Sequence, residues 1–436
     1  MRRQRRWLFV AAVLAGITGL TVSASAAPTG PVRTTATSGT PALSSADTSQ
    51  LIRQLVQCGS TMYAVGTVTR LTQNGSTFAR TNIFSFGATA PFTLTSWAPS
   101  VNGTVNSIAF SGNDCSTAYI GGSFSVVNGT AVQNLAKIST SSGAVDPTFR
   151  HAANKQVETL LVWSHHVLTG GYFTTINGSS RRYFASLNPT SGADDGYLNL
   201  NISGNYQFPG VGSNPSRVYN QQLSHAGNKL LVEGDFTSVG GQHREQIFML
   251  DLGATTAGVD GWTSNEFLTN CNFNEAFYLQ DAAWSVDDAT VFTATTGYKP
   301  NGSSASGPRT GLCDSAAAFP ANPRSVSHRW INYTGCDSLY SIAADATTVY
   351  VGGHERWMSN PNGCDNKGSG AINAPGMAGL STATGAVTWN PGRGRGKGAD
   401  DMLITTAGLW IGSDNMDNTN MCTGKNGLAG ICFISY

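Results

Sequence analysis

The stretch that decides the fold is "YIGGSFSVVNGT", residues 119–130. A similar phrase, "LTGGYFTTINGS", follows at residues 168–179. In both copies, paired glycines follow an apolar residue, and an Asn-Gly pair comes a few residues later. Asn-Gly between two strand-like runs is typical of a tight β-hairpin, because both central residues of such a turn need positive φ. The phrase therefore predicts a repeated antiparallel β unit.

The phrase occurs seven times along the chain. Its copies open 49 to 63 residues apart, at Tyr63, Tyr119, Leu168, Leu231, Phe292, Tyr350 and Trp410. An apolar strand precedes each copy and a third strand follows it, and a regular period of this size indicates a repeat architecture. Small sheets can bury both faces by packing around an axis. The predicted fold class is all-β, a seven-bladed β-propeller of three- to four-stranded antiparallel blades, with a linear β solenoid or tandem sandwiches as the alternative.

The two ends of the chain carry separate expectations. Residues 1–26 read as a signal peptide, because a basic start and a largely apolar run of 16 residues precede small residues suited to cleavage after Ala26. Residues 27–47 read as a flexible N-terminal lead-in, and residues 48–436 as the propeller. The last repeat ends at Tyr436 after its third strand, so we expect residues 31–37 to supply the missing fourth strand. The mature chain is expected to be secreted, extracellular and without a membrane span.

The charge composition excludes some partners. Charged residues make up 12% of the chain, about half the usual quarter. Lys and Arg number 26 against 25 acidic residues, so neither sign dominates and no electrostatic case exists for nucleic acid. No nucleophile elbow, phosphate loop or zinc-protease motif occurs. We therefore expect no cofactor and favour a binding protein over an enzyme, although a glycosidase pair such as Asp400 and Asp414 stays open.

The eight cysteines form a second map of the fold. An even number in an exported chain predicts disulfides. No zinc-like Cys or Cys/His spacing occurs, which argues against a zinc site. In the repeat map, two cysteines lie in equivalent turns of neighbouring repeats, and the others lie close together within single repeats. The predicted disulfide-stabilised pairs are Cys58–Cys115, Cys271–Cys313, Cys336–Cys364 and Cys422–Cys432.

The loops between second and third strands are long in repeats five to seven, and loops on a rigid scaffold are where binding usually resides. Repeat six departs from its siblings there, because Glu355 stands where they carry Phe. Such a break marks a functional or strained place. We expect His354, Glu355, Arg356 and Trp357 to bind ligand, with the Trp357 indole stacking on a sugar. The alternative is a Glu355–Arg356 surface pair with Trp357 packed against its own loop.

Two further clusters are candidates. Asp400 and Asp401 end a Gly- and Arg-rich run and are expected to contact ligand, with a solvated loop as the alternative. Asp414, Asn415 and Asp417 could together offer oxygens to calcium, with an Asx-rich turn as the alternative. Calcium is thus the one metal that the sequence suggests.

The phrase "YxGGxF…NG…LAxL…TGxxD" resembles secreted bacterial β-propellers built from delta-sixty or kelch-like repeats, over nearly the whole mature chain. The resemblance implies a lectin-like module that recognises a glycan or cell-surface ligand, and a place in a larger secreted assembly such as an antibacterial toxin particle. Repeats five to seven depart from the pattern, so inherited function is least secure there. A glycoside hydrolase or polysaccharide lyase on the same fold, and a protein-binding disc, are the alternatives.

Overall fold

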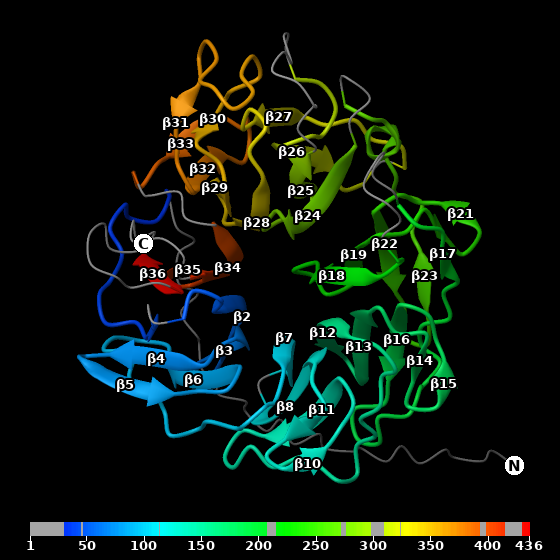
Figure 1. Ribbon diagram of the computed structural model, residues 1–436. Coiled ribbons are helices and arrows are strands. Elements are labelled where there is room, and N and C mark those ends of the chain that lie inside the picture. Colours follow the sequence, from blue (N-terminus) through cyan, green and yellow to red (C-terminus); the bar gives the residue numbers. More distant parts are fainter. Residues whose placement is uncertain are drawn as a thin grey trace, which may run out of the picture.

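The structure is a computed structural model that describes residues 30–44, 47–112, 114–206, 215–271, 276–297, 309–322, 324–392, 398–414 and 430–436. These residues form antiparallel sheets almost throughout. In the same ranges the one helical segment is the 3-10 turn η1, Asn265–Leu268. Figure 1 shows the larger sheets arranged around a common centre, each edge-on to it. The all-β, propeller-like architecture predicted from the repeat is confirmed.

Seven sheets carry the repeat, and we number them one to seven along the chain. Their inner strands are β2 Leu51–Cys58, β7 Thr104–Ser111, β12 Val157–Trp163, β18 Val218–Leu223, β24 Phe277–Trp284, β28 Leu339–Ala344 and β34 Ala399–Thr405. The second strands are β3 Thr61–Thr67, β8 Asp114–Ser123, β13 His166–Gly171, β19 Lys229–Gly234, β25 Thr290–Gly297, β29 Thr348–Gly353 and β35 Gly408–Ser413. The third strands are β6 Ile83–Gly87, β11 Leu135–Ser139, β16 Phe184–Leu187, β22 Ile247–Leu252, β26 Ser315–Pro320, β32 Met377–Ser381 and β36 Ile431–Ser435.

Outer strands complete the sheets. Sheets four to six have a fourth strand: β23 Ala257–Val259, β27 Trp330–Tyr333 and β33 Val387–Trp389. Smaller sheets are formed by β1 Ala42–Leu43 with β4 Arg70–Gln73 and β5 Ser76–Ala79, by β9 Val126–Val127 with β10 Thr130–Ala131, by β14 Thr175–Ile176 with β15 Ser179–Ser180, by β17 Ile202–Ser203 with β20 Ser238–Val239 and β21 Gln242–His243, and by β30 Trp357–Met358 with β31 Ile372–Asn373. The Asn-Gly turns behave as predicted, since Asn128 and Gly129 have φ of 46° and 78°.

The core is divided among the junctions between neighbouring sheets. One apolar cluster of buried side chains lies at each junction, including that between sheet seven and sheet one. At this last junction the Trp410 ring packs 5.7 Å from Phe86 and 4.6 Å from Phe433, between ring centroids. An isolated β-bridge between Leu51 and Asp414 also joins the two sheets. Each sheet is thus stabilised on both faces by apolar burial against its neighbours.

The N-terminal segment lies against the last strand, as predicted. Arg33 N donates to Ser435 O at 2.9 Å, and Thr37 N donates to Phe433 O at 2.8 Å. The segment also reaches sheet six, because the Trp389 indole donates to Arg33 O at 3.0 Å. Residues near the start of the described chain therefore hydrogen-bond to the free edge of β36.

Three of the four predicted disulfides are confirmed: Cys58–Cys115, Cys271–Cys313 and Cys336–Cys364. The first joins β2 of sheet one to β8 of sheet two. The second joins segments on either side of the first hairpin of sheet five, and the third does the same in sheet six. The fourth predicted pair, Cys422–Cys432, lies partly outside the described residues.

Candidate functional site

All seven inner strands carry a β-bulge at the equivalent place. The register between the inner and second strands shifts by one residue in every sheet, so that one inner-strand residue has no partner opposite it. A bulge re-aims the side chain of the extra residue. The seven bulged residues are Arg53, Asn106, Glu158, Tyr219, Gln280, Tyr340 and Asp400, and all of them line one cavity on the axis.

The paired glycines of the repeated phrase explain these bulges. A Cβ on Gly171 would lie 2.3 Å from Gln156 O, on the inner strand of its own sheet. A Cβ on the preceding Gly170 would lie 2.7 Å from Val218 Cγ1, on the inner strand of the next sheet. Both distances are far below ordinary van der Waals contact. The second glycine therefore permits the bulge, and the first permits the next sheet to approach.

The residue after each bulge ties neighbouring sheets together. Its side chain hydrogen-bonds to the adjacent inner strand, and the bonds are 2.6–3.3 Å long. We call this set the girdle. Its bonds run from Leu55 N to Asp401, Ile108 N to Gln54, Leu160 N to Ser107, Gln221 to Thr159, Asn220 to Asp281, Ile342 N to Asp281, and Ser341 to Ala399 O. Every junction between consecutive sheets, including seven to one, has one such bond.

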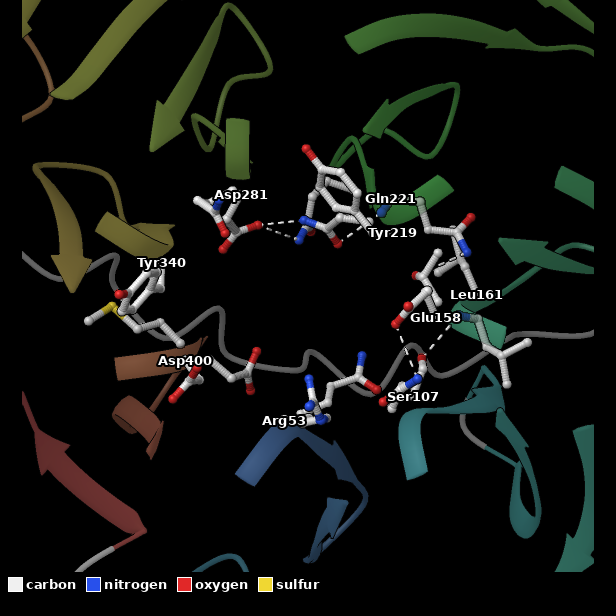
Figure 2. A pocket seen from close by; sticks show the side chains of 18 of the residues that line it. Arg53, Ser107, Glu158, Leu161, Tyr219, Gln221, Asp281, Tyr340 and Asp400 are labelled. Carbon is white, nitrogen blue, oxygen red and sulfur yellow. Dashed lines mark hydrogen bonds between the residues drawn. The ribbon is translucent and has the colours of Figure 1, made fainter. Parts of the chain in front are cut away.

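The bulges and girdle surround an axial pocket of about 510 Å³. Figure 2 shows side chains from sheets far apart in sequence, such as Arg53, Glu158 and Tyr340, converging around it. The wall carries the carboxyl groups of Glu158, Asp281, Asp400 and Asp401 and the guanidinium groups of Arg53 and Arg217. Amides and two tyrosines fill the spaces between them. The bulges lie near the start of the inner strands, so they share the rim from which the second-to-third strand loops leave.

Burial changes the chemistry of the carboxyl groups. Desolvation raises the pKa of Asp281 to about 7, against hydrogen bonds from Ile342 N and Asn220 that lower it. Desolvation also raises the pKa of Asp401 to about 7, and the charges of Asp281 and Asp400 add to the rise. Glu233 stands where other repeats have glycine, is fully buried, and has a pKa raised well above its ordinary value by burial and by the Asp281 charge. A like-charged group nearby and loss of water both disfavour the ionised form.

Arg217 is held within the wall. Its Nε lies 2.7 Å from Asp235 Oδ2, and its NH1 lies 3.4 Å from Glu158 Oε1. Its guanidinium carbon also lies 5.0 Å from the ring centroids of both Tyr172 and Tyr219. Two carboxylates and two rings therefore share this cation.

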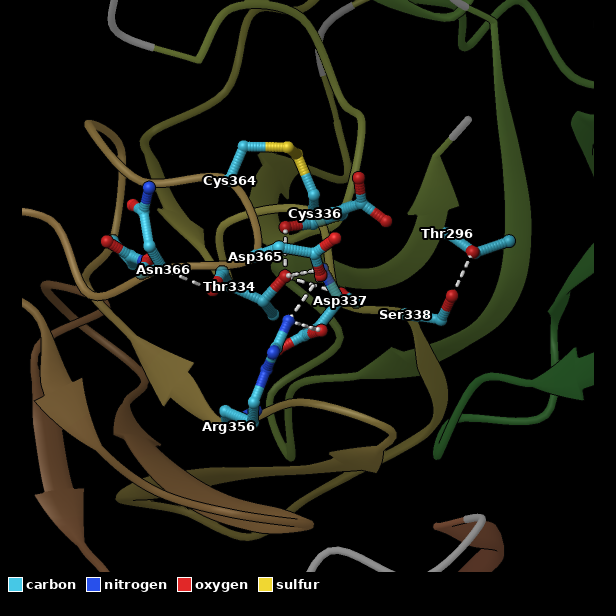
Figure 3. A network of polar contacts seen from close by, with 11 residues as sticks. Thr296, Thr334, Cys336, Asp337, Ser338, Arg356, Cys364, Asp365 and Asn366 are labelled. Atoms are coloured by element: carbon cyan, nitrogen blue, oxygen red, sulfur yellow. Dashed lines mark hydrogen bonds and ion pairs between the residues drawn. A yellow bond between two sulfur atoms is a disulfide. The ribbon is translucent and has the colours of Figure 1, made fainter. Parts of the chain in front are cut away.

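The predicted loop residues of sheet six lie elsewhere, in a self-contained cluster. Arg356 forms bonds of 2.8 and 2.9 Å to the carboxylate of Asp337 and a further ion pair of 2.5 Å with Asp365. Its guanidinium carbon lies 4.5 Å from the centroid of Trp357. Figure 3 shows these groups beside the Cys336–Cys364 disulfide. We call Arg356, Asp337, Asp365 and Trp357 the Arg356 cluster.

This geometry resolves the earlier alternatives only in part. Glu355 is fully buried, so it does not form the expected surface pair, and Arg356 pairs with Asp337 and Asp365 instead. Trp357 is half-buried under the Arg356 guanidinium, and His354 N donates to Ser338 O at 2.7 Å. Ligand binding by His354, Glu355, Arg356 and Trp357 stays a prediction.

Asp400 and Asp401 lie on β34 in the axial pocket, not in a solvated loop. The structure thus separates them from the sheet-six residues with which the sequence grouped them. For calcium, Asp414 is buried at the end of β35, while Asn415 and Asp417 lie outside the described residues. In the part of the chain that the structure describes, no group of three or more His, Cys, Asp or Glu side chains could hold a metal ion.

Sequence reasoning missed Arg53, Glu158, Tyr219 and Tyr340. A signal for them exists, because each bulged residue lies 10 to 13 positions before the residue that opens its repeated phrase. The signal is invisible to a search for motifs, since the residue type differs at every copy. Only the shared register shows that these side chains occupy equivalent places.

Comparison with known proteins supports the scaffold and no activity. Residues 119–149 match the family model described as "Domain of unknown function (DUF5122) beta-propeller". The solved "Structure of U3-55K" is similar with a TM-score of 0.50 and 9% identity, over 92% of this chain and 100% of that one. The "Crystal structure of RRP9 WD40 repeats" follows with a TM-score of 0.48 and 9% identity, over 93% and 99% of the two chains. No curated protein matches this chain.

The chain is therefore a β-propeller scaffold, stabilised by disulfides. Identities this low indicate a shared fold and carry no activity across. The described residues contain no helical segment with the length and hydrophobicity of a bilayer-spanning helix.

Proposed function

We propose that this chain is a secreted, lectin-like binding module, in which the seven sheets are the blades of a closed seven-bladed propeller and a glycan binds in the axial pocket. The observation that carries the proposal is the set of seven bulges, each of which places one polar or aromatic side chain in the same cavity. Function in propellers resides in sites grafted on the scaffold, so the pocket and not the fold carries the argument.

The pocket wall suits a polyhydroxylated ligand. Carboxylates, amides and guanidinium groups can exchange several hydrogen bonds with sugar hydroxyls, and Tyr219 and Tyr340 offer amphipathic rings. Concave sites with a few convergent polar groups are the usual form of small-ligand sites. The three described disulfides are compatible with an oxidising, extracellular setting.

The resemblance to exported propellers adds a partner to this proposal. The module would present its glycan-binding pocket as one subunit of a larger secreted assembly of the antibacterial toxin type. A binding disc without catalysis suits that role, because the girdle occupies Asp281 and Asp401 with backbone donors. Copurification of a stable protein partner from culture supernatant is the corresponding measurement.

A glycan array tests the proposed site with two matched aromatic variants, Tyr340→Ala in the pocket and Trp357→Ala in the Arg356 cluster. We expect wild type to bind selected glycans, Tyr340→Ala to lose most of the signal, and Trp357→Ala to retain it. The opposite result would move the site to the loops of sheets five to seven. A wild-type protein that binds no glycan on the array would contradict the lectin proposal.

A second candidate, hydrolysis of a polysaccharide, is favoured by one observation. Asp281 and Asp401 lie in the same pocket, and burial brings the pKa of each to about 7, the range that suits a general acid at neutral pH. Release of reducing ends from polysaccharides by wild type, and its loss in Asp401→Asn, would replace the binding module with an enzyme.

A further inference from the structure

We propose that the glycan of the axial pocket is cationic, and that a protonated amine of a deacetylated amino sugar lies among the carboxylates of Asp281, Asp400 and Asp401. This inference rests on the proposed function, since it assumes that a glycan occupies this pocket. It adds the charge and the chemical class of the sugar.

The first argument is the balance of charge on the pocket wall. Four carboxyl groups face two guanidinium groups there. One of the two, Arg217, is already shared between Glu158 at 3.4 Å and Asp235 at 2.7 Å, and Asp235 is 1% exposed. Arg53 alone then stands against Asp281, Asp400 and Asp401. A cationic ligand would offset this excess of negative charge in a site partly removed from water.

The second argument concerns hydrogen-bond acceptors that the protein leaves unmet. Asn106 and Gln221 line the pocket, each is 7% exposed, and neither Asn106 Oδ1 nor Gln221 Oε1 has a donor. The amide orientations are fixed, because Asn106 Nδ2 donates to Val157 O at 2.9 Å and Gln221 Nε2 donates to Leu168 O at 3.1 Å. Buried polar atoms are normally hydrogen-bonded. Two amide oxygens therefore wait for donors, which ammonium and hydroxyl groups supply.

The third argument is the placement of the tyrosines. Tyr219 and Tyr340 occupy the bulge positions of sheets four and six, on either side of the sheet that carries Asp281. Figure 2 shows them around the same hollow as Asp281 and Asp400. Aromatic rings attract cations, and they also pack against the apolar faces of sugar rings. An amino sugar combines both properties in one ligand.

Neutral and peptide ligands fit less well. An N-acetylated sugar carries no charge and would leave the carboxylates without a partner, which is costly in a desolvated site. A lysine side chain supplies an ammonium group, but its alkyl stem has no donors for Asn106 Oδ1 and Gln221 Oε1. An amino sugar supplies the ammonium group and several hydroxyl donors at once.

Isothermal calorimetry with glucosamine oligomers and N-acetylglucosamine oligomers of equal length tests the inference. We expect wild type to bind the glucosamine oligomer, and to bind the acetylated oligomer at least about tenfold more weakly, since a charged hydrogen bond is lost. Asp400→Asn should weaken glucosamine binding about tenfold, and Asp400→Glu should restore most of it. The matched control is Asp251→Asn, because Asp251 is 59% exposed beside Lys229 on sheet four. It should leave binding unchanged, and added salt should weaken wild-type binding.

The outcomes separate the two levels of the proposal. Equal binding of both oligomers, or tighter binding of the acetylated one, would overturn the cationic ligand and leave the lectin function standing. Tighter binding of lysine oligomers than of glucosamine oligomers would overturn the glycan itself, and with it the proposed function. Loss of binding in Asp251→Asn equal to that in Asp400→Asn would show a general effect of net charge and overturn the assignment to the pocket.

Discussion

The axial pocket and the Arg356 cluster are both polar, but they differ in how their groups are satisfied. In the Arg356 cluster, one guanidinium group bonds two carboxylates and covers an indole ring. In the pocket, two buried amide oxygens have no donor and carboxylates outnumber cations. The cluster is complete within the protein, whereas the pocket has capacity left for a ligand.

The difference teaches how to interpret a break in a repeat. Repeat six breaks the pattern with Glu355, and the structure buries that residue and locks its neighbour Arg356 to Asp337. A break of this kind can belong to stability alone. In contrast, the bulged positions vary freely from Arg53 to Asp400 because no repeated contact constrains the side chain that points to the axis.

Gly171→Ala should have the largest effect on the comparison, because it attacks the bulge that builds the pocket. The new Cβ would lie 2.3 Å from Gln156 O and 2.9 Å from Val157 Cα. We expect a loss of about 3–4 kcal/mol in the free energy of unfolding, measured by urea denaturation. The control is Gly258→Ala, which has no atom within 4 Å of its Cβ. Equal stability of the two variants would contradict the role of the glycine.

Arg356→Ala should be the next largest. It leaves the Asp337 carboxylate, which is 2% exposed, without its cation, and removal of one partner from a buried pair costs about 3 kcal/mol. Urea denaturation should show this loss, while calorimetry on the folded variant should show unchanged glycan binding. A variant of normal stability that fails to bind would reverse the roles of the pocket and the cluster.

The pocket should also give the protein a pH dependence that weakens with Asp281→Asn. The folded chain holds the Asp281 proton up to about pH 7, whereas the unfolded chain releases it near the ordinary pKa of 3.8. Between these values unfolding releases a proton, so a rise in pH lowers the free energy of unfolding. We expect the stability gap between wild type and Asp281→Asn to narrow from pH 4 to pH 7. A gap that widens over this range would contradict the assignment.

Arg53→Ala should have the smallest effect. Arg53 is exposed at its bulge, so stability should change by less than about 0.5 kcal/mol. Because the variant removes a positive charge from the pocket, it should bind glucosamine oligomers about two- to threefold more tightly. Calorimetry checks this, and weaker binding would mean that Arg53 contacts the ligand.

The repeat was readable from the sequence because packing is the same in every copy. Each phrase needs an apolar strand, a residue small enough for the next sheet and a tight turn, so residues such as Gly170 and Gly171 recur at a fixed spacing. The N-terminal segment and the pairs Cys58–Cys115, Cys271–Cys313 and Cys336–Cys364 followed from the same map.

The pocket was not readable in this way. Its wall takes one residue from each inner strand, and residues such as Arg53 and Asp400 are neighbours only when sheet seven meets sheet one. Of the site residues named from sequence, Asp400 and Asp401 lie in this wall, but they were selected for a glycine-rich loop and not for a bulge.

The sequence by itself determined the all-β repeat and the pairing of most cysteines, because these depend on local spacing and on burial that every repeat shares. The tertiary structure alone decided which polar side chains meet on the axis and that Arg356 is bound within its own sheet. The physical reason is distance along the chain: strand register and turn geometry act over a few residues, whereas the charge of the pocket sums over seven strands that closure brings together.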